Sequence, residues 1–330
     1  MSSDAIETRG LSRVYKSYRK PEGVWNSLKG LWDRQTVEKT ALQPTTLRIA
    51  PGQIVGLVGA NGAGKTTLLK LLSGLITPSH GDALVLGHHP WKRESAFLKR
   101  VSILLGQKNQ LWWDLAPLDS FALLARIYDL DLAATRRRVQ ELTKRLQCDH
   151  VVETQLRRLS LGERMKMEII GALLHSPDVL FLDEPTIGLD IVAQESIRDF
   201  LAGYVRSRGP TVILTSHYMD DIAQLAHSLL LISKGAIVYE GTVQDFTRKT
   251  ESVQTLSVRF AEDLAADVRL DGDLHLAKGG KEFHLKIPAD RLGPVIAELS
   301  RHGSIQDLKT EETDFEDVIK SFLATESRLL

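Results

Sequence analysis

Residues 59–66, with the sequence GANGAGKT, have the types and spacing of a loop that binds phosphate groups. An apolar run over residues 54–58 precedes this loop, and leucines at helical spacing follow it. Strand, glycine-rich loop and helix in this order let backbone N–H groups turn toward an anion at a helix N-terminus. We therefore predict a nucleotide site, in which Lys65 reaches the β- and γ-phosphates and the Thr66 hydroxyl binds magnesium.

Two adjacent carboxylates follow a second apolar run, at residues 179–182. Asp183 lies where a carboxylate at a strand end can bind magnesium, usually through water. Glu184 is one residue further on, free of the metal, and can polarise a water molecule for attack on the γ-phosphate. The pair predicts hydrolysis of the bound nucleotide, with Glu184 as general base.

Four further elements make the chain similar to the ABC ATPase family. Residues 159–163, LSLGE, resemble the family signature, usually LSGGQ, about twenty residues before the acidic strand end. Gln107 follows a strand-like run and resembles the family's glutamine-loop residue, and His217 resembles its switch histidine. Tyr15 lies where the family commonly stacks an aromatic ring on adenine, and Tyr18 competes for this role. The elements occur in the family's order, which makes the match specific.

This resemblance implies a homodimer, because in the family the signature of one subunit closes over the ATP bound by the other. Ser160 and Gly162 would then contact the partner chain's nucleotide. Leu161 replaces the first glycine of the signature, and Glu163 replaces its glutamine. Since leucine is costly at positive φ, we expect an ordinary backbone at Leu161. We expect Glu163 in the first turn of a helix, near the γ-phosphate without touching it.

The predicted site can now be given in full. The catalytic residues are Glu184, His217 and Gln107, and the magnesium ligands are Thr66, Gln107 and Asp183. The residues expected to hold ATP are Tyr15, Gly59, Asn61, Gly62, Ala63, Gly64, Lys65, Thr66, Thr67, Ser160, Gly162 and Asp183.

The order of strand-like and helical runs predicts an α/β fold, a P-loop ABC ATPase core with an antiparallel β layer and a helical subdomain, plus a small C-terminal α+β domain. We expect the nucleotide-binding domain at 1–245 and the accessory domain at 246–330. Within the first, residues 108–158 are dominated by helical periodicity and are expected to form the helical subdomain, while residues 16–36 form an amphipathic insertion.

Two tryptophan-bearing segments leave alternatives open. In the insertion, the apolar side chains at residues 24–32 recur on one helical face among lysines and arginines. This helix either meets the membrane partner or lipid headgroups, or packs on the protein's own β layer. Trp112 and Trp113 either both pack inside or line a groove for a partner helix, with at least one of them at the contact.

Composition narrows the class of protein. The chain has 42 Lys plus Arg and 42 Asp plus Glu, so its zero net charge argues against a nucleic-acid binder. A single cysteine, Cys148, excludes an internal disulfide and a cysteine-cluster zinc site. We see neither a secretion signal nor an apolar run long enough to cross a bilayer, so an integral membrane permease would have to be a separate chain.

We therefore expect an ATPase that uses ATP and Mg²⁺ at the cytoplasmic face of the membrane, peripherally, to power export through that permease. The alternatives are an ATPase for cell-surface polysaccharide export, a soluble ABC ATPase, and a binding module without hydrolysis. The intact Glu184 and His217 argue against the last of these.

Overall fold

The computed structural model describes residues 4–18, 36–106, 109–250, 253–264, 268–269, 275–276, 280–288, 291–312 and 315–329. The chain divides into two units, residues 1–241 with 326–330, and residues 242–325. The predicted helix at residues 24–32 lies outside the described residues. The two ends of the predicted insertion are strand residues, since Lys16, Ser17 and Tyr18 pair with residues 38, 37 and 36.

The first unit contains a six-stranded sheet in the order β10-β9-β4-β8-β7-β6. Its strands are β4 (Ile54–Val58), β6 (Val101–Leu105), β7 (Val179–Asp183), β8 (Thr211–Thr215), β9 (Ser228–Ser233) and β10 (Ala236–Thr242). The central strands β4, β7 and β8 are parallel to their neighbours and nearly all of their residues are buried. Short runs of branched apolar residues suit strands that are covered on both faces.

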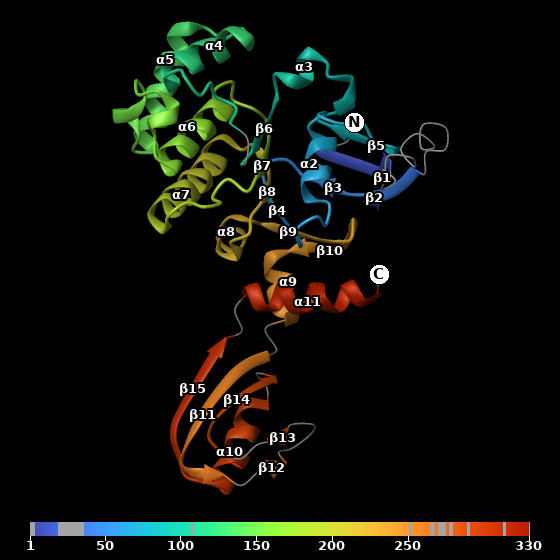
Figure 1. Ribbon diagram of the computed structural model, residues 1–330, viewed down its shortest axis with the longest axis vertical. Coiled ribbons are helices and arrows are strands. Elements are labelled where there is room, and N and C mark those ends of the chain that lie inside the picture. The colour runs from blue at the N-terminus through green and yellow to red at the C-terminus, as the bar shows by residue number, and fades with distance from the viewer. Residues whose placement is uncertain are drawn as a thin grey trace, which may run out of the picture. The chain divides into compact units, whose positions relative to one another are not determined.

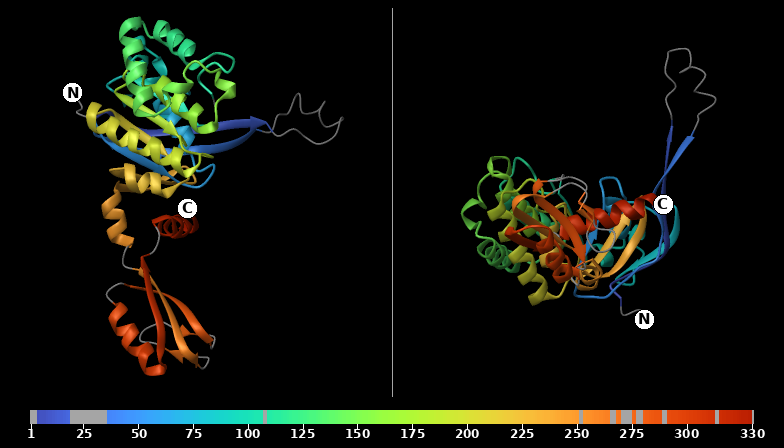
Figure 2. Two further views of the ribbon diagram at one scale, coloured as in Figure 1. Left: turned by 90° about the vertical axis from the view of Figure 1, so that its left-hand side faces the viewer. Right: turned by 90° about the horizontal axis from the view of Figure 1, so that it is seen from below.

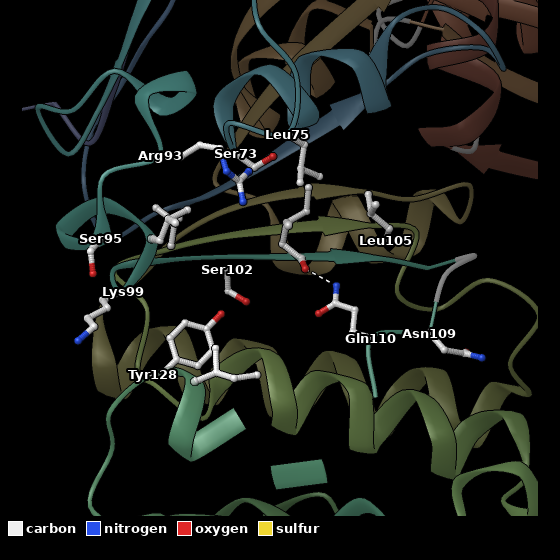
Figure 3. Close-up of a pocket in the computed structure, with 14 residues that line it drawn as sticks. Ser73, Leu75, Arg93, Ser95, Lys99, Ser102, Leu105, Asn109, Gln110 and Tyr128 are labelled. Atoms are coloured by element: carbon white, nitrogen blue, oxygen red, sulfur yellow. Dashed lines mark hydrogen bonds between the residues drawn. The ribbon is translucent and has the colours of Figure 1, made fainter. Parts of the chain in front are cut away.

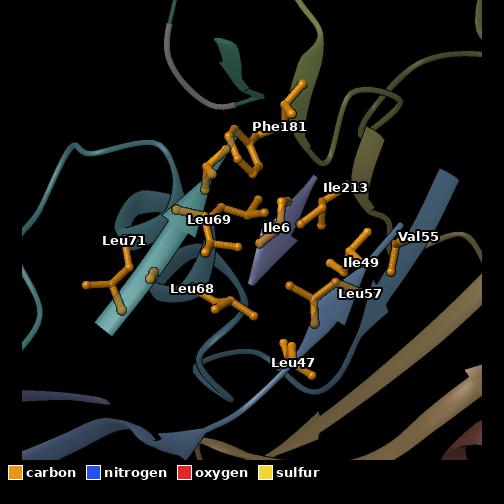
Figure 4. Close-up of a cluster of buried hydrophobic side chains, with 14 of the residues drawn as sticks. Ile6, Leu47, Ile49, Val55, Leu57, Leu68, Leu69, Leu71, Phe181 and Ile213 are labelled. Atoms are coloured by element: carbon orange, nitrogen blue, oxygen red, sulfur yellow. The ribbon is translucent and has the colours of Figure 1, made fainter. Parts of the chain in front are cut away.

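The second sheet of this unit is antiparallel. It contains β1 (Ile6–Tyr18), β2 (Thr36–Thr45), β3 (Arg48–Ile49) and β5 (His80–Val85), with β1 paired to each of the others. Helix α2 (Lys65–Leu72) packs between the two sheets, and Figure 4 shows Leu68, Leu69 and Leu71 of α2 among side chains from both. This shared core fixes the start of α2 relative to β4.

Helices α4 (Pro117–Ile127), α5 (Leu132–Arg145), α6 (Leu161–Leu173) and α7 (Ile191–Arg208) form the other side of the first unit, away from β1 and β2 (Figure 1). The unit also contains α3 (Ser95–Leu98), α8 (Met219–Leu225) and the short 3₁₀ turns η1 (Pro90–Lys92), η2 (Asp149–Val151) and η3 (Leu156–Arg158). Helix α6 begins at Leu161, which is not among the described residues with positive φ. The expectation of an ordinary backbone at Leu161 is confirmed.

The second unit is α+β, which confirms the predicted class of the C-terminal part. Strand β11 (Val253–Leu264) pairs antiparallel with β14 (Gly280–Pro288) and β15 (Ile305–Glu312). Helix α10 (Leu292–His302) lies along one face of this sheet (Figure 2). Its Val295 and Leu299 side chains belong to the buried core of this unit. The remaining elements are α9 (Val243–Thr250), β12 (Val268–Arg269), β13 (His275–Leu276) and α11 (Phe315–Leu329).

Candidate active site

The phosphate-binding sequence forms the turn between β4 and α2. Gly64 is the N-cap of α2 with φ of 118°, and a Cβ atom there would lie 2.6 Å from the Ala41 carbonyl oxygen. Both the backbone angle and the close approach require glycine. Because α2 begins at Lys65, its unpaired N–H groups and the positive end of its dipole face the turn, which makes an anion site.

The Lys65 ammonium lies inside this turn. Its Nζ atom donates to the carbonyl oxygens of Gly59 at 2.7 Å and Ala60 at 3.3 Å. Burial lowers the pKa of Lys65, and the carboxylates of Glu184 and Asp183 partly raise it again. A desolvated cation held only by carbonyl oxygens is well suited to exchange those contacts for the phosphate oxygens of a nucleotide.

Asp183, at the end of β7, is held by two hydroxyl groups. Thr66 Oγ1 donates to Asp183 Oδ2 at 2.9 Å, and Thr215 Oγ1, at the end of β8, donates to Oδ1 at 2.7 Å. A carboxylate beside a hydroxyl is the donor pair that Mg²⁺ takes when phosphates and water supply its other ligands. The described residues contain no group of three or more His, Cys, Asp or Glu side chains that would hold a metal alone. The residues therefore fit a magnesium ion bound together with a nucleotide.

Glu184 follows Asp183 and turns the chain away from the strand. It has φ of 57°, an uncommon conformation for this residue type, and its N–H donates to Thr215 O and Oγ1, both at 3.0 Å. Its side chain, 15% exposed, lies with Oε1 2.9 Å from Nε2 of His217. The strained turn thus separates the two carboxylates, one toward Thr66 and the other toward His217.

Gln107 lies outside the described residues. Its neighbour Gly106 contacts the backbone of Asp183 and Glu184. The Gly106 N–H donates to the Asp183 carbonyl oxygen at 2.8 Å. A Cβ atom at Gly106 would lie 2.5 Å from the Glu184 carbonyl oxygen and 2.7 Å from that of Asp183. The end of β6 therefore packs directly against the backbone that carries both carboxylates.

A cavity of about 270 Å³ lies over the phosphate-binding turn. Among the predicted residues, it is lined by Tyr15, Asn61, Gly62, Gly64, Lys65, Thr66, Thr67 and Glu184. Tyr15 is 37% exposed, and the guanidinium of Arg13 lies 4.8 Å from its ring centre. A half-exposed ring at the cavity wall can stack on a nucleobase.

Within the phosphate-binding turn, two predicted ATP residues do not line this cavity. Ala63 is buried, and its N–H donates to the Ala60 carbonyl oxygen. Gly59 packs against Ile232, where a Cβ atom would lie 2.2 Å from the carbonyl oxygen. Both residues shape the turn from behind, while their neighbours face the cavity.

Sequence reasoning missed three residues of the site. Lys39 and Ala41 line the cavity from β2, and Lys39 pairs with Tyr15 across the sheet. This register follows two shifts in the β1–β2 pairing, which no local pattern reveals. Thr215 did carry a signal, because it is a hydroxyl residue at the end of a buried strand, two positions before His217.

Ser160 and Gly162 do not line the cavity either. Ser160 is the N-cap of α6 and forms a capping box with Glu163. Gly162 is in the first turn of α6, where a Cβ atom would lie 3.0 Å from the Ala193 side chain. Within one chain, the LSLGE motif thus forms a second helix N-terminus separate from the phosphate-binding turn.

The fold and the geometry define a nucleoside triphosphatase of the P-loop class. The family model described as "ABC transporter" matches residues 42–187. The chain is 31% identical over 236 residues to the ABC transporter ATP-binding protein NatA of Bacillus subtilis (strain 168), covering 72% of this chain and 95% of NatA. It is 28% identical over 322 residues to the daunorubicin/doxorubicin resistance ATP-binding protein DrrA of Streptomyces peucetius, covering 95% and 91%.

A Nod factor export ATP-binding protein I, from Cupriavidus metallidurans, is 35% identical over 195 residues, with 59% of this chain and 64% of that protein covered. Among solved structures, a dimeric ATP-binding cassette in a post-hydrolysis state with ADP and Pi matches with a TM-score of 0.61 at 20% identity, over 72% of this chain and 98% of that one. The structural likeness confirms the predicted fold.

This chain belongs to the ABC transporter ATP-binding proteins and is an ATPase. Among the residues that the structure describes, no helix is both long and apolar enough to cross a membrane.

Proposed function

We propose that this ATPase powers export of a substrate through a separate membrane permease, working as a homodimer at the cytoplasmic face. The observation that carries the proposed chemistry is the arrangement at the ends of β7 and β8. There Thr66 meets Asp183, and Glu184 meets His217, beside the phosphate-binding turn. The names of relatives in drug resistance and Nod factor export support the direction of transport.

In the proposed mechanism, Lys65 and the N-terminus of α2 hold the β- and γ-phosphates. Thr66, Asp183 and Gln107 would hold Mg²⁺, which would neutralise phosphate charge. Glu184 accepts a proton from the attacking water, and its hydrogen-bond partner His217 orients it and contacts the γ-phosphate. The general base is kept off the metal because the turn at Glu184 points it away from Asp183.

The homodimer is proposed because one chain carries one phosphate-binding turn and one LSLGE motif on different helix N-termini. Ser160 and Gly162 would close on the partner chain's nucleotide. Near this motif, Ile191 and Val192 are 71% and 75% exposed, and Leu161 is 38% exposed beside Gly188. Exposed apolar side chains around a polar motif suit a surface that another copy covers.

A cavity of about 580 Å³ supports the contact with the permease (Figure 3). It lies between β6 and Tyr128, and Asn109 and Gln110 form part of its wall just after residues 107–108. Glu168 of α6 accepts the Gln110 N–H at 3.0 Å, so this wall is tied to the helix that begins after Ser160. A permease segment seated here would contact the stretch that follows Gln107, and substrate selection would belong to the permease.

The two tryptophans at the start of this subdomain are exposed. Trp112 is 41% and Trp113 is 43% exposed, so the interpretation that both pack inside is wrong. Arg164 lies 5.2 Å from the Trp113 ring centre, so the Trp113 ring already has a cation partner within the chain. We propose Trp112 as a contact for the partner helix.

The experiment is Glu184→Gln in the full chain. Turnover of MgATP should fall by about 10²–10⁴, the range for loss of a general base, while ATP binding is retained. ATP should then trap a dimer that is visible by size-exclusion chromatography. Glu262→Gln, an exposed residue of β11 in the second unit, serves as the matched control. Unchanged turnover in Glu184→Gln would remove this residue from the mechanism.

A further inference from the structure

The N-terminus of α6 contains a contact that the proposed reaction does not use. Glu163 Oε2 accepts the Ser160 hydroxyl at 2.7 Å and the Ser160 N–H at 2.9 Å. Ser160 Oγ accepts the Glu163 N–H at 3.3 Å in return. The carboxylate therefore already accepts the hydrogen bond that, under the proposed function, the Ser160 hydroxyl would donate to the partner's γ-phosphate.

Glu163 carries a negative charge at this point. Hydrogen bonds from the Ser160 side chain and backbone lower the pKa of Glu163, burial opposes this, and His150 lowers it further. His150 of η2 reaches Glu163 with its Nε2 atom 3.6 Å from Oε1, and 65% of its side chain is exposed. Glu163 also acts electrostatically on the buried Cys148 thiol, as do Lys166 and Asp149.

A phosphate in the closed dimer would meet this charge. An oxygen that accepts the Ser160 hydroxyl would lie within two hydrogen bonds of the Glu163 carboxylate, a separation of roughly 5 Å. Like charges at that distance repel each other, and an interface with little water shields them poorly. A proton on His150 would offset the charge of Glu163 from the opposite side.

We propose that Glu163 is a positioning residue that keeps the Ser160 hydroxyl hydrogen-bonded within its own chain and so weakens ATP-driven closure of the dimer. Protonation of His150 relieves this effect. This inference rests on the proposed function, since it needs the composite site. In this proposal, the glutamate that replaces the usual glutamine of the signature controls dimer closure. Closure should be easier at pH 6 than at pH 8, because imidazoles change charge in that range.

Glu163→Gln isolates the charge, because a capping box accepts Glu or Gln at this position and α6 keeps its cap. The test measures the MgATP concentration for half-maximal dimer formation in the full-length Glu184→Gln protein, by analytical ultracentrifugation at pH 6.0 and 8.0. Adding Glu163→Gln should lower this concentration roughly three- to tenfold at pH 8.0, and less at pH 6.0. Its melting temperature should stay at that of the parent.

His150→Gln tests the same charge without changing α6. At pH 6.0 it should raise the half-maximal concentration toward the pH 8.0 value, and it should have no effect once Glu163→Gln is present. Every other group of the protein and the ATP phosphates are the same in all these proteins, so their contribution cancels in the comparison between variants.

The outcomes separate the two proposals. A parent protein that dimerises with ATP while Glu163→Gln leaves the concentration unchanged would overturn this inference alone. Equal behaviour of His150→Gln and the parent at pH 6.0 would remove His150 from it. A parent that forms no dimer with ATP would refute the composite site itself, and this inference with it.

Discussion

The close packing of Gly106 against the backbone of Asp183 and Glu184 permits a quantitative test by Gly106→Ala. The added Cβ would lie 2.5 Å from the Glu184 carbonyl oxygen, roughly 0.9 Å closer than the 3.4 Å at which ordinary contact begins. The second contact, at 2.7 Å, is with the carbonyl oxygen of Asp183. Both are backbone atoms and cannot rotate away, so the ends of β6 and β7 must separate. Backbone strain from a positive φ adds nothing to this cost, because Gly106 is not among the described glycines with positive φ.

The cost follows from this displacement. Forcing extra atoms into a packed interior costs about 1–3 kcal/mol, which corresponds to a fall in melting temperature of roughly 2–10 °C for a unit of this size. A shift of about 1 Å in a reacting group can lower turnover by about 10². ATP affinity should change little, because β7 and β8 separate β6 from β4, which leads into the phosphate-binding turn.

The assay compares phosphate release, ATP affinity and thermal unfolding in the wild type, Gly106→Ala and Gly293→Ala. Gly293 is the matched control, since it lies in α10 of the second unit and has no atom within 4 Å of its Cβ position. An alanine there should leave turnover unchanged and, in a helix, should not destabilise the protein. Wild-type turnover and melting temperature in Gly106→Ala would refute the packing argument. An equal loss of ATP affinity would show that the damage is general unfolding.

Two further predictions concern buried titratable groups of the first unit. Burial raises the pKa of the Cys148 thiol from 9.0 to about 12. At pH 8 a disulfide reagent should therefore label this thiol about a thousandfold more slowly in the native than in the denatured protein. Labelling at similar rates would contradict this prediction. Burial also raises the pKa of Glu168, whose stabilising effect is present below about 4.5 and is lost as pH rises through the raised value. The unfolding free energy of Glu168→Gln relative to wild type, measured with urea, should therefore increase from pH 4.5 to pH 8, and a constant difference would refute this.

Much of this site could be predicted from sequence because its central parts are local. The phosphate-binding turn depends on glycines next to one another in the chain, and Asp183 and Glu184 are adjacent at one strand end. Position along a strand was enough to place these groups at the sheet edge. The ordinary backbone at Leu161 also followed from residue types, since leucine is costly at the positive φ that a glycine adopts freely.

What escaped prediction depends on pairings between distant segments. Lys39 reaches the cavity only because β2 pairs with β1 in a register that two irregularities set. His150 approaches Glu163 across the connection between η2 and α6, and its sequence neighbours show no motif. Gln107 and residues 24–32 lie outside the described part of the chain, so their roles stay predictions.

One pairing explains why the proposed catalytic groups converge. Strands β7 and β8 are parallel and in register, so that Asp183 lies opposite Thr215. From this single position Thr215 donates to the Asp183 carboxylate and accepts the Glu184 N–H, and the chain continues to His217 two residues later. A one-residue slip between these strands would move Thr215 to the other face of the sheet and break all these contacts at once. All residues of β8 and all but one of β7 are buried. Such a slip would therefore be costly, because every apolar side chain of these strands would have to repack. The buried core of the parallel sheet therefore sets the spacing between Asp183, Glu184 and His217, the residues proposed as metal ligand, general base and its partner.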